Sequence, residues 1–171
     1  MIPFRNVAET LLAAYGPQGW WPADDAFEIM LGAVLVQRTN WANAARAIEQ
    51  LKQAGLGDPA ALADAPAASV ETSVRCAGFF RTKARRLGAL ARFVVASGGT
   101  DRLAAEETAA LRKALLENEG IGPESADAIL LYAFARPAVV IDGYLRRVAA
   151  RMLGSDTAPP DRELRVSIAT A

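Results

Sequence analysis

Residues 117–142 read ENEGIGPESADAILLYAFARPAVVID. Gly120 and Gly122 permit the positive φ angles of a sharp turn, and Pro123 suits the first position of a new helix. We therefore predict a helix that ends near residue 117, a tight hairpin, and an apolar helix over residues 123–134. Free N–H groups at a helix start can bind an anion such as a phosphate, although the same turn also serves to join two packed helices.

The spacing from this hairpin to Ile141-Asp142 resembles that of the helix-hairpin-helix DNA glycosylase superfamily, of the endonuclease III type. The resemblance implies that Asp142 is the catalytic carboxylate. Glu124 falls where some relatives have the lysine of a strand-cleaving lyase, and a carboxylate has no amine with which to form a Schiff base. The resemblance therefore implies a monofunctional, hydrolytic glycosylase. From the residues alone, Asp142 is equally interpreted as the N-cap of a helix that begins at Gly143.

Two further stretches are similar to bacterial 3-methyladenine DNA glycosylases related to endonuclease III. One contains Trp20 and Trp21, followed by a proline, and the other runs from Gln37 to Trp41. The resemblance implies that the three tryptophans line a pocket for a flipped base, with Trp41 and Trp20 or Trp21 as a sandwich, and that Gln37 fills the gap left in the duplex. The alternatives are indoles that fill a core and a glutamine at an exposed helix end.

The pattern of apolar residues and caps predicts an all-α protein with the two-lobed helix-hairpin-helix DNA glycosylase fold. We expect a helical lobe over residues 27–136 and a second lobe from residues 1–26 and 137–171, with Asp142 in the cleft between them. Relatives continue beyond the last residue of this chain, so we expect a second lobe that is truncated on its C-terminal side.

Composition limits the chemistry. The chain has one cysteine, Cys76, and no histidine, so neither an iron–sulfur cluster nor a Cys/His zinc site is expected, and we predict no metal and no cofactor. Nineteen basic and nineteen acidic residues give no net charge, so any contact with DNA must be local. The predicted contacts with the DNA backbone are Gly120, Ile121, Gly122, Glu124 and Ser125 in the main hairpin, and Gly78, Arg81 and Lys83 in a second small hairpin. The other basic candidates are Arg85, Arg86, Arg92, Arg146, Arg147 and Arg151, and such runs are also typical of a solvated helix face.

No apolar run approaches the length of a membrane span, and the N-terminus lacks a signal-peptide pattern, so we expect a cytoplasmic monomer that does not enter a membrane. The predicted partner is double-stranded DNA that contains a damaged base. The predicted function is hydrolysis of the N-glycosidic bond of an alkylated purine, such as 3-methyladenine, in base excision repair. The alternatives are a non-catalytic helix-hairpin-helix DNA-binding module, a decayed or truncated glycosylase, or a helical protein-interaction domain.

Overall fold

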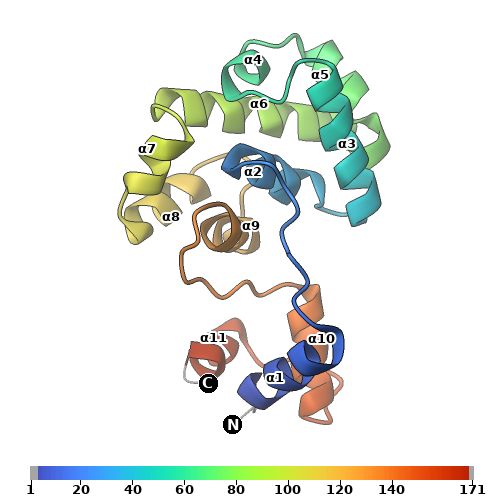
Figure 1. Ribbon diagram of the computed structural model, residues 1–171, viewed down its shortest axis with the longest axis vertical. Coiled ribbons are helices and arrows are strands. Elements are labelled where there is room, and N and C mark those ends of the chain that lie inside the picture. Colours follow the sequence, from blue (N-terminus) through green and yellow to red (C-terminus); the bar gives the residue numbers. More distant parts are fainter. Residues whose placement is uncertain (1–3, 170–171) are drawn as a thin grey trace. The chain divides into compact units, whose positions relative to one another are not determined.

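The computed structural model describes residues 4–169, and within this range the secondary structure is helical with no β-strand (Figure 1). The all-α prediction is therefore confirmed. The chain divides into two compact units, of which the larger is Trp21–Arg136 and the smaller combines the segments before and after it.

The larger unit starts at Trp21, whose indole packs against Gly32. Its helices are α2 (Ala26–Leu35), α3 (Trp41–Gln53), α4 (Pro59–Ala63), α5 (Ala67–Ser73), the 3-10 helix η1 (Arg75–Ala77), α6 (Phe80–Ala96), α7 (Thr100–Ala105), α8 (Thr108–Leu116), α9 (Pro123–Ala128) and the π-helix η2 (Ile129–Ala133).

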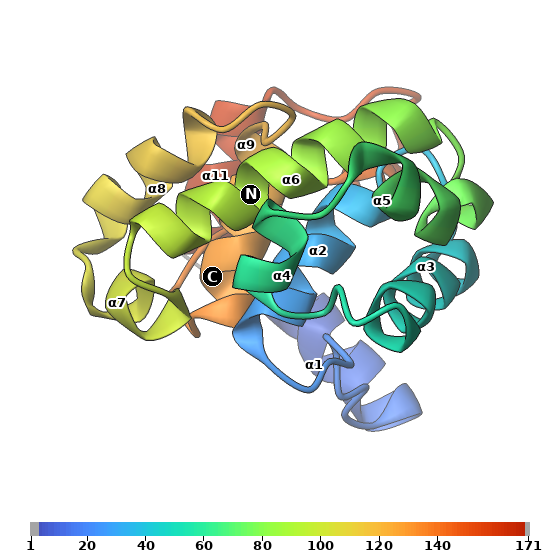
Figure 2. The ribbon, with the colours of Figure 1, turned by 90° about the horizontal axis from the view of Figure 1, so that it is seen from above.

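Helix α2 is the centre of the larger unit. Every residue from Ile29 to Leu35 is buried, and α2 contacts α6 on one side and α9 and η2 on another (Figure 1). Helices α4 and α5 pack beside the long helix α6 (Figure 2). Such an apolar helix, buried on most of its circumference, gives the surrounding helices and their connecting turns a fixed support.

Side-chain caps begin several of these helices where the sequence indicates them. Asp25, Asn40 and Asp58 each accept a hydrogen bond from a backbone N–H in the first turn of the following helix. Helix α6 begins at Phe80, after a left-handed Phe79, and none of the described side chains caps it. The apolar run at 123–134 is not one regular helix either, since it changes to a π-helix at Ile129.

The smaller unit contains α1 (Phe4–Tyr15), α10 (Gly143–Met152) and α11 (Asp161–Ala169). Its buried core is Ile141, Ala149 and Leu164, and Phe4 packs against this core from α1. Arg146 and Asp161 form an ion pair between α10 and α11. These contacts join the first and last described segments of the chain into one unit.

Candidate functional site

The hairpin between α8 and α9 is a tight turn whose two glycines differ. Gly120 has φ +84°, which favours glycine, whereas Gly122 has φ −88° and an extended backbone. Both glycines permit a positive φ, but only Gly120 adopts one. A Cβ at Gly122 would meet nothing within 4 Å, so this N-cap of α9 has open space beside its backbone. Ile121, between the glycines, is buried and anchors the turn.

Gln37 is held by this hairpin. Its Nε2 donates to the Gly120 carbonyl at 2.9 Å and to Ser125 Oγ at 3.1 Å, and its Oε1 accepts from Arg86 Nη1 at 2.9 Å. The Arg86 side chain also passes against Gly120, where an added Cβ would lie 2.2 Å from Cδ. Gln37 is thus a half-buried link between α2, α6 and the hairpin, and not a freely solvated helix end.

A groove of about 860 Å³ opens in front of these groups. It brings together seven of the predicted DNA-binding residues: Gln37, Lys83, Gly120, Ile121, Gly122, Glu124 and Ser125. Its remaining lining residues are Arg38, Phe79, Thr82, Arg86, Leu116, Asn118 and Pro123. The groove therefore combines a helix start, a charged guanidinium and amide groups along one surface.

Phe79 and Arg38 are groove residues to which sequence reasoning gave no role. Phe79 is 62% exposed, and both residues have left-handed backbones, with φ +47° and φ +55°. The Arg38 guanidinium lies 5.9 Å from the centroid of the Phe79 ring. A bulky residue with positive φ is uncommon and often marks a functional constraint. An aromatic residue directly after Gly78, in a turn between two helices, is the sequence signal that could have identified Phe79.

The structure corrects the prediction that Lys83 is a contact with the DNA backbone. The Lys83 side chain is buried, and Nζ donates to the carbonyls of Leu35 and Ala77, each at 2.7 Å. Burial lowers the pKa of Lys83 from its ordinary value, because desolvation disfavours the charged form. A phosphate outside the protein would not reach a group held in this way.

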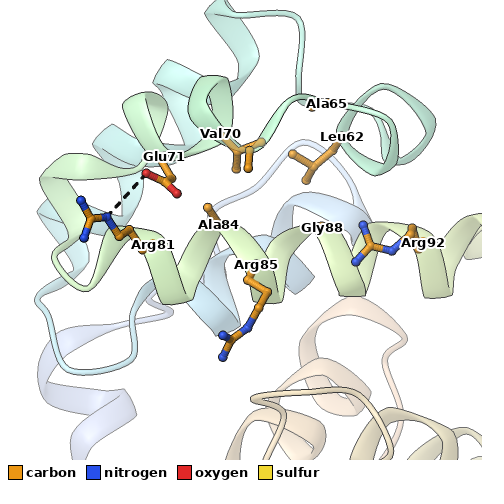
Figure 3. Close-up of a pocket in the computed structure, with 10 residues that line it drawn as sticks. Leu62, Ala65, Val70, Glu71, Arg81, Ala84, Arg85, Gly88 and Arg92 are labelled. Carbon is orange, nitrogen blue, oxygen red and sulfur yellow. Dashed lines mark ion pairs between the residues drawn. The ribbon is translucent and has the colours of Figure 1, made fainter.

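Arg81 lies apart from the groove residues. It lines a separate hollow of about 380 Å³ beside α4, α5 and α6, and it pairs with Glu71 at 4.0 Å (Figure 3). Residues 81 and 83 on one helix point in nearly opposite directions, because successive positions rotate by about 100°. The sequence placed both residues at one DNA surface, but the helix separates them.

An aromatic cluster is formed by Trp21, Trp41 and Tyr132. The Trp21 and Trp41 ring centroids are 5.3 Å apart with planes at 90°, and Tyr132 of η2 is 5.6 Å from Trp21. Rings packed edge to face do not offer two parallel faces between which a base could stack, so the predicted sandwich of Trp41 with Trp21 is not the arrangement in this structure. Tyr132 was missed by sequence reasoning, and its π-helical position, a feature frequent at functional sites, shows only in three dimensions. Trp20 belongs to the smaller unit and is 46% exposed.

Asp142 is fixed within the smaller unit. Ile141 is buried in the core, and the next residue, Asp142, is the N-cap of α10, with Oδ1 accepting from Leu145 N at 2.7 Å. The N-cap interpretation is therefore confirmed. The half-buried carboxylate is held at a helix N-terminus, where the helix dipole favours its negative charge.

Comparison with known proteins decides the family. Residues 31–169 match the model of the HhH-GPD superfamily base excision DNA repair protein. The chain belongs to this superfamily. A candidate DNA repair glycosylase of Methanocaldococcus jannaschii is 38% identical over 150 residues, which are 86% of this chain and 68% of that protein. Endonuclease III of Thermotoga maritima is 28% identical over 138 residues, which are 80% of this chain and 61% of that enzyme.

Solved structures of the superfamily show the same fold. The H. pylori 3-methyladenine DNA glycosylase bound to 1,N6-ethenoadenine has a TM-score of 0.77 and 31% identity, with coverage of 94% of this chain and 75% of that one. A trapped endonuclease III–DNA covalent intermediate has a TM-score of 0.71 at 19% identity, with coverage of 85% and 66%. The predicted helix-hairpin-helix glycosylase fold is confirmed.

Two further findings concern residues 4–169 only. Among them, no group of three or more histidine, cysteine, aspartate or glutamate side chains is arranged to hold a metal ion. No helix within this part of the chain has both the length and the apolar character needed to cross a bilayer.

Proposed function

We propose that this HhH-GPD protein is a monofunctional DNA glycosylase that hydrolyses the N-glycosidic bond of an alkylated purine, such as 3-methyladenine, in double-stranded DNA. The observation that carries the proposal is Asp142, a carboxylate anchored between a buried isoleucine and the start of α10. The resemblance to the superfamily pattern supports Asp142 as the catalytic aspartate.

The proposed chemistry uses the negative charge of Asp142. Cleavage of an N-glycosidic bond passes through an oxocarbenium-like state, so a fixed anion beside the sugar stabilises the positive charge that develops and can orient the attacking water. The cap fixes one carboxylate oxygen through the Leu145 N–H. A group that is already ordered does not have to reorganise during the reaction, which is the basis of electrostatic catalysis.

The proposed substrate class is supported by the aromatic cluster and by the similarity to the H. pylori enzyme. The H. pylori enzyme, 31% identical, is a 3-methyladenine DNA glycosylase. In DNA, 3-methyladenine carries a positive charge, which the faces of Trp21, Trp41 and Tyr132 would attract by cation–π interaction. Such a cationic base also leaves readily without an acid catalyst, in agreement with a chain that has no histidine.

The absence of lyase chemistry is proposed from Glu124. It lies at the start of α9, at the position where the lyase pattern has a lysine, and a carboxylate cannot form the Schiff base on which strand cleavage depends. We expect Glu124 to shape the entrance of the groove beside the hairpin.

The proposed DNA backbone contact is the groove of the larger unit. Gly122 leaves open space at the start of α9, so a phosphate could approach the positive end of the helix there. We expect the exposed Phe79 to open base steps, and we expect Gln37 to exchange its present hydrogen bonds to the hairpin and Arg86 for those that an extruded base leaves behind.

The test is release of methylated bases from alkylated duplex DNA by the wild type and by Asp142→Asn. We expect the wild type to release 3-methyladenine and to leave an uncut abasic strand, and we expect Asp142→Asn to release no base above background. Asparagine is as good an N-cap as aspartate, so the melting temperature should stay unchanged. Asp142→Ala, which removes the cap as well, should lose activity and also about 1 kcal/mol of stability.

Two outcomes would refute the proposal. Base release that is as fast in Asp142→Asn as in the wild type would remove Asp142 from the chemistry. Strand cleavage by the wild type without alkali, at the rate of base release, would show a lyase. DNA binding without base release in any variant would instead favour a non-catalytic binding module.

A further inference from the structure

The buried ammonium of Lys83 has no part in the chemistry proposed above. Lys83 is 2% exposed, and its Nζ donates to Leu35 O and to Ala77 O, each at 2.7 Å. Leu35 is the last residue of α2, and Ala77 is the last residue of η1. Carbonyl groups at the end of a helix have no N–H donor within that helix. The Lys83 ammonium therefore provides a donor to one such carbonyl at the end of α2 and to another at the end of η1.

Each of these helix ends leads directly into a turn of the groove. Gln37 and Arg38 follow α2, and Gly78 and Phe79 follow η1. Arg38 and Phe79 have positive φ angles, and the two side chains face each other across 5.9 Å. Left-handed backbones of bulky residues persist only where the surrounding structure enforces them. Lys83 is the side chain that bonds to both backbones immediately before these turns.

We propose that Lys83 is a positioning residue that fixes the turn carrying Gln37 relative to the turn carrying Phe79, so that both side chains meet DNA in one register. Entry of these side chains into DNA rests on the function proposed above, whereas the coupling of the two turns does not. Lysine suits this position because its ammonium has three donors and no acceptor. Burial lowers the pKa of Lys83, and the two carbonyls provide the polar contacts that keep the group in place.

Hydrogen exchange of the free protein tests the coupling. Lys83→Met keeps an unbranched side chain, one heavy atom shorter, and removes the donors. We expect amides in residues 36–40 and 77–80 to exchange faster by about tenfold, the change that loss of one hydrogen bond to a charged donor makes in a local opening equilibrium. The segments of α3 and α8 should keep their wild-type rates.

Two control variants on the same helix separate positioning from general loosening. Arg92→Met makes the same change of charge at an exposed position of α6 and should alter neither turn. Leu87→Ala removes packing from a fully buried position and should accelerate exchange throughout the larger unit. The proposal is overturned if Lys83→Met leaves both turns at wild-type rates, frees only one of them, or accelerates all segments as Leu87→Ala does.

A DNA measurement then examines the consequence. The probe is a duplex with a stable abasic-site analogue and 2-aminopurine opposite it, whose fluorescence rises when that base unstacks. We expect the wild type to raise the fluorescence and Lys83→Met to raise it by less than half as much; an equal rise would contradict a positioning role. Neither this probe nor hydrogen exchange needs base release, so both remain informative if the glycosylase assay fails.

A second variant covers the case in which Lys83→Met does not fold. Lys83→Arg retains a cation but replaces the compact ammonium with a longer, planar group, so we expect the two carbonyls to shift from their wild-type spacing. The same two segments should exchange faster in Lys83→Arg than in the wild type. Unchanged exchange in both segments would overturn the proposal.

Discussion

Replacing Gly120 with alanine should break the link between the hairpin and α6. Gly120 has φ +84°, and an added Cβ would lie 2.2 Å from Cδ and 2.3 Å from Nε of Arg86. Arg86 would have to move away, and its hydrogen bond to Gln37 would be lost with it. The perturbation therefore combines backbone strain with the loss of one charged hydrogen bond.

The expected loss of stability follows from these two effects. A left-handed backbone costs an alanine about 1–2 kcal/mol, and a hydrogen bond to a charged group contributes about 1.5–3 kcal/mol. We expect Gly120→Ala to lose about 3–4 kcal/mol in total, which lowers the melting temperature of a chain of this size by roughly 10 °C. Thermal unfolding followed by circular dichroism measures this loss.

A double-mutant cycle with Arg86→Ala identifies its origin. Arg86→Ala alone should lose the Gln37 hydrogen bond, and adding Gly120→Ala should then cost only the backbone strain of about 1–2 kcal/mol. Losses that add to within about 0.5 kcal/mol would refute the reasoning, because they would show that Gly120 and Arg86 act independently. Gly122→Ala is the matched control: its φ is negative and its Cβ meets nothing, so it should lose only about 0.5–1 kcal/mol as a poorer N-cap.

Further predictions concern three other sites. Gly32→Ala places a Cβ 2.9 Å from the Trp21 ring, so overpacking should lower the free energy of unfolding by about 1–3 kcal/mol. The tryptophan fluorescence emission should change as well, and unchanged emission would contradict this contact. Asp127→Asn should lose about 2–3 kcal/mol in urea unfolding, since it leaves Arg112 without its buried charged partner at 2.7 Å; a loss below about 0.5 kcal/mol would show that the pair is replaceable. The hydrogen bond from Arg146 lowers the pKa of Asp161 below its ordinary 3.8. The Arg146–Asp161 pair therefore stabilises the folded state above pH 3.8, and this stabilisation is lost as the pH falls through the lowered pKa. Asp161→Asn should therefore flatten the fall of melting temperature in acid, and an unchanged profile would exclude the pair as its cause.

Local signals in the sequence predicted much of this fold. The proline at the start of α9, the Asp142 cap of α10 and the apolar periodicities depend on neighbours within a few residues, which the sequence displays directly. The hairpin was predicted for the same reason. The sequence suggested a positive φ for both of its glycines, but only Gly120 has one, whereas Gly122 is extended. The two could not be distinguished because backbone angles depend on the path of the whole turn.

The contacts of the site were less predictable because they join residues far apart in the chain. Gln37 bonds to Gly120, 83 positions away, and Lys83 bonds to Leu35, 48 positions away. A lysine in a basic run favours a solvated surface, and only the packing of α6 against α2 shows that this one is buried. The sequence could identify which residues were chemically suited to a site. Tertiary contacts decide whether a charged side chain faces solvent or is buried and bonds to backbone carbonyls.

Asp142 is a residue for which the structural and the catalytic interpretation support each other. An N-cap holds its carboxylate by one oxygen, here through the Leu145 N–H, and the buried Ile141 fixes the backbone before it. A catalytic anion gains from the same restraints, because electrostatic stabilisation is strongest when the charge is ordered before the reaction. The cap needs only an acceptor oxygen, whereas the chemistry needs the negative charge. The amide of Asp142→Asn keeps the acceptor and removes the charge, so stability without activity in this variant would identify the carboxylate as catalytic.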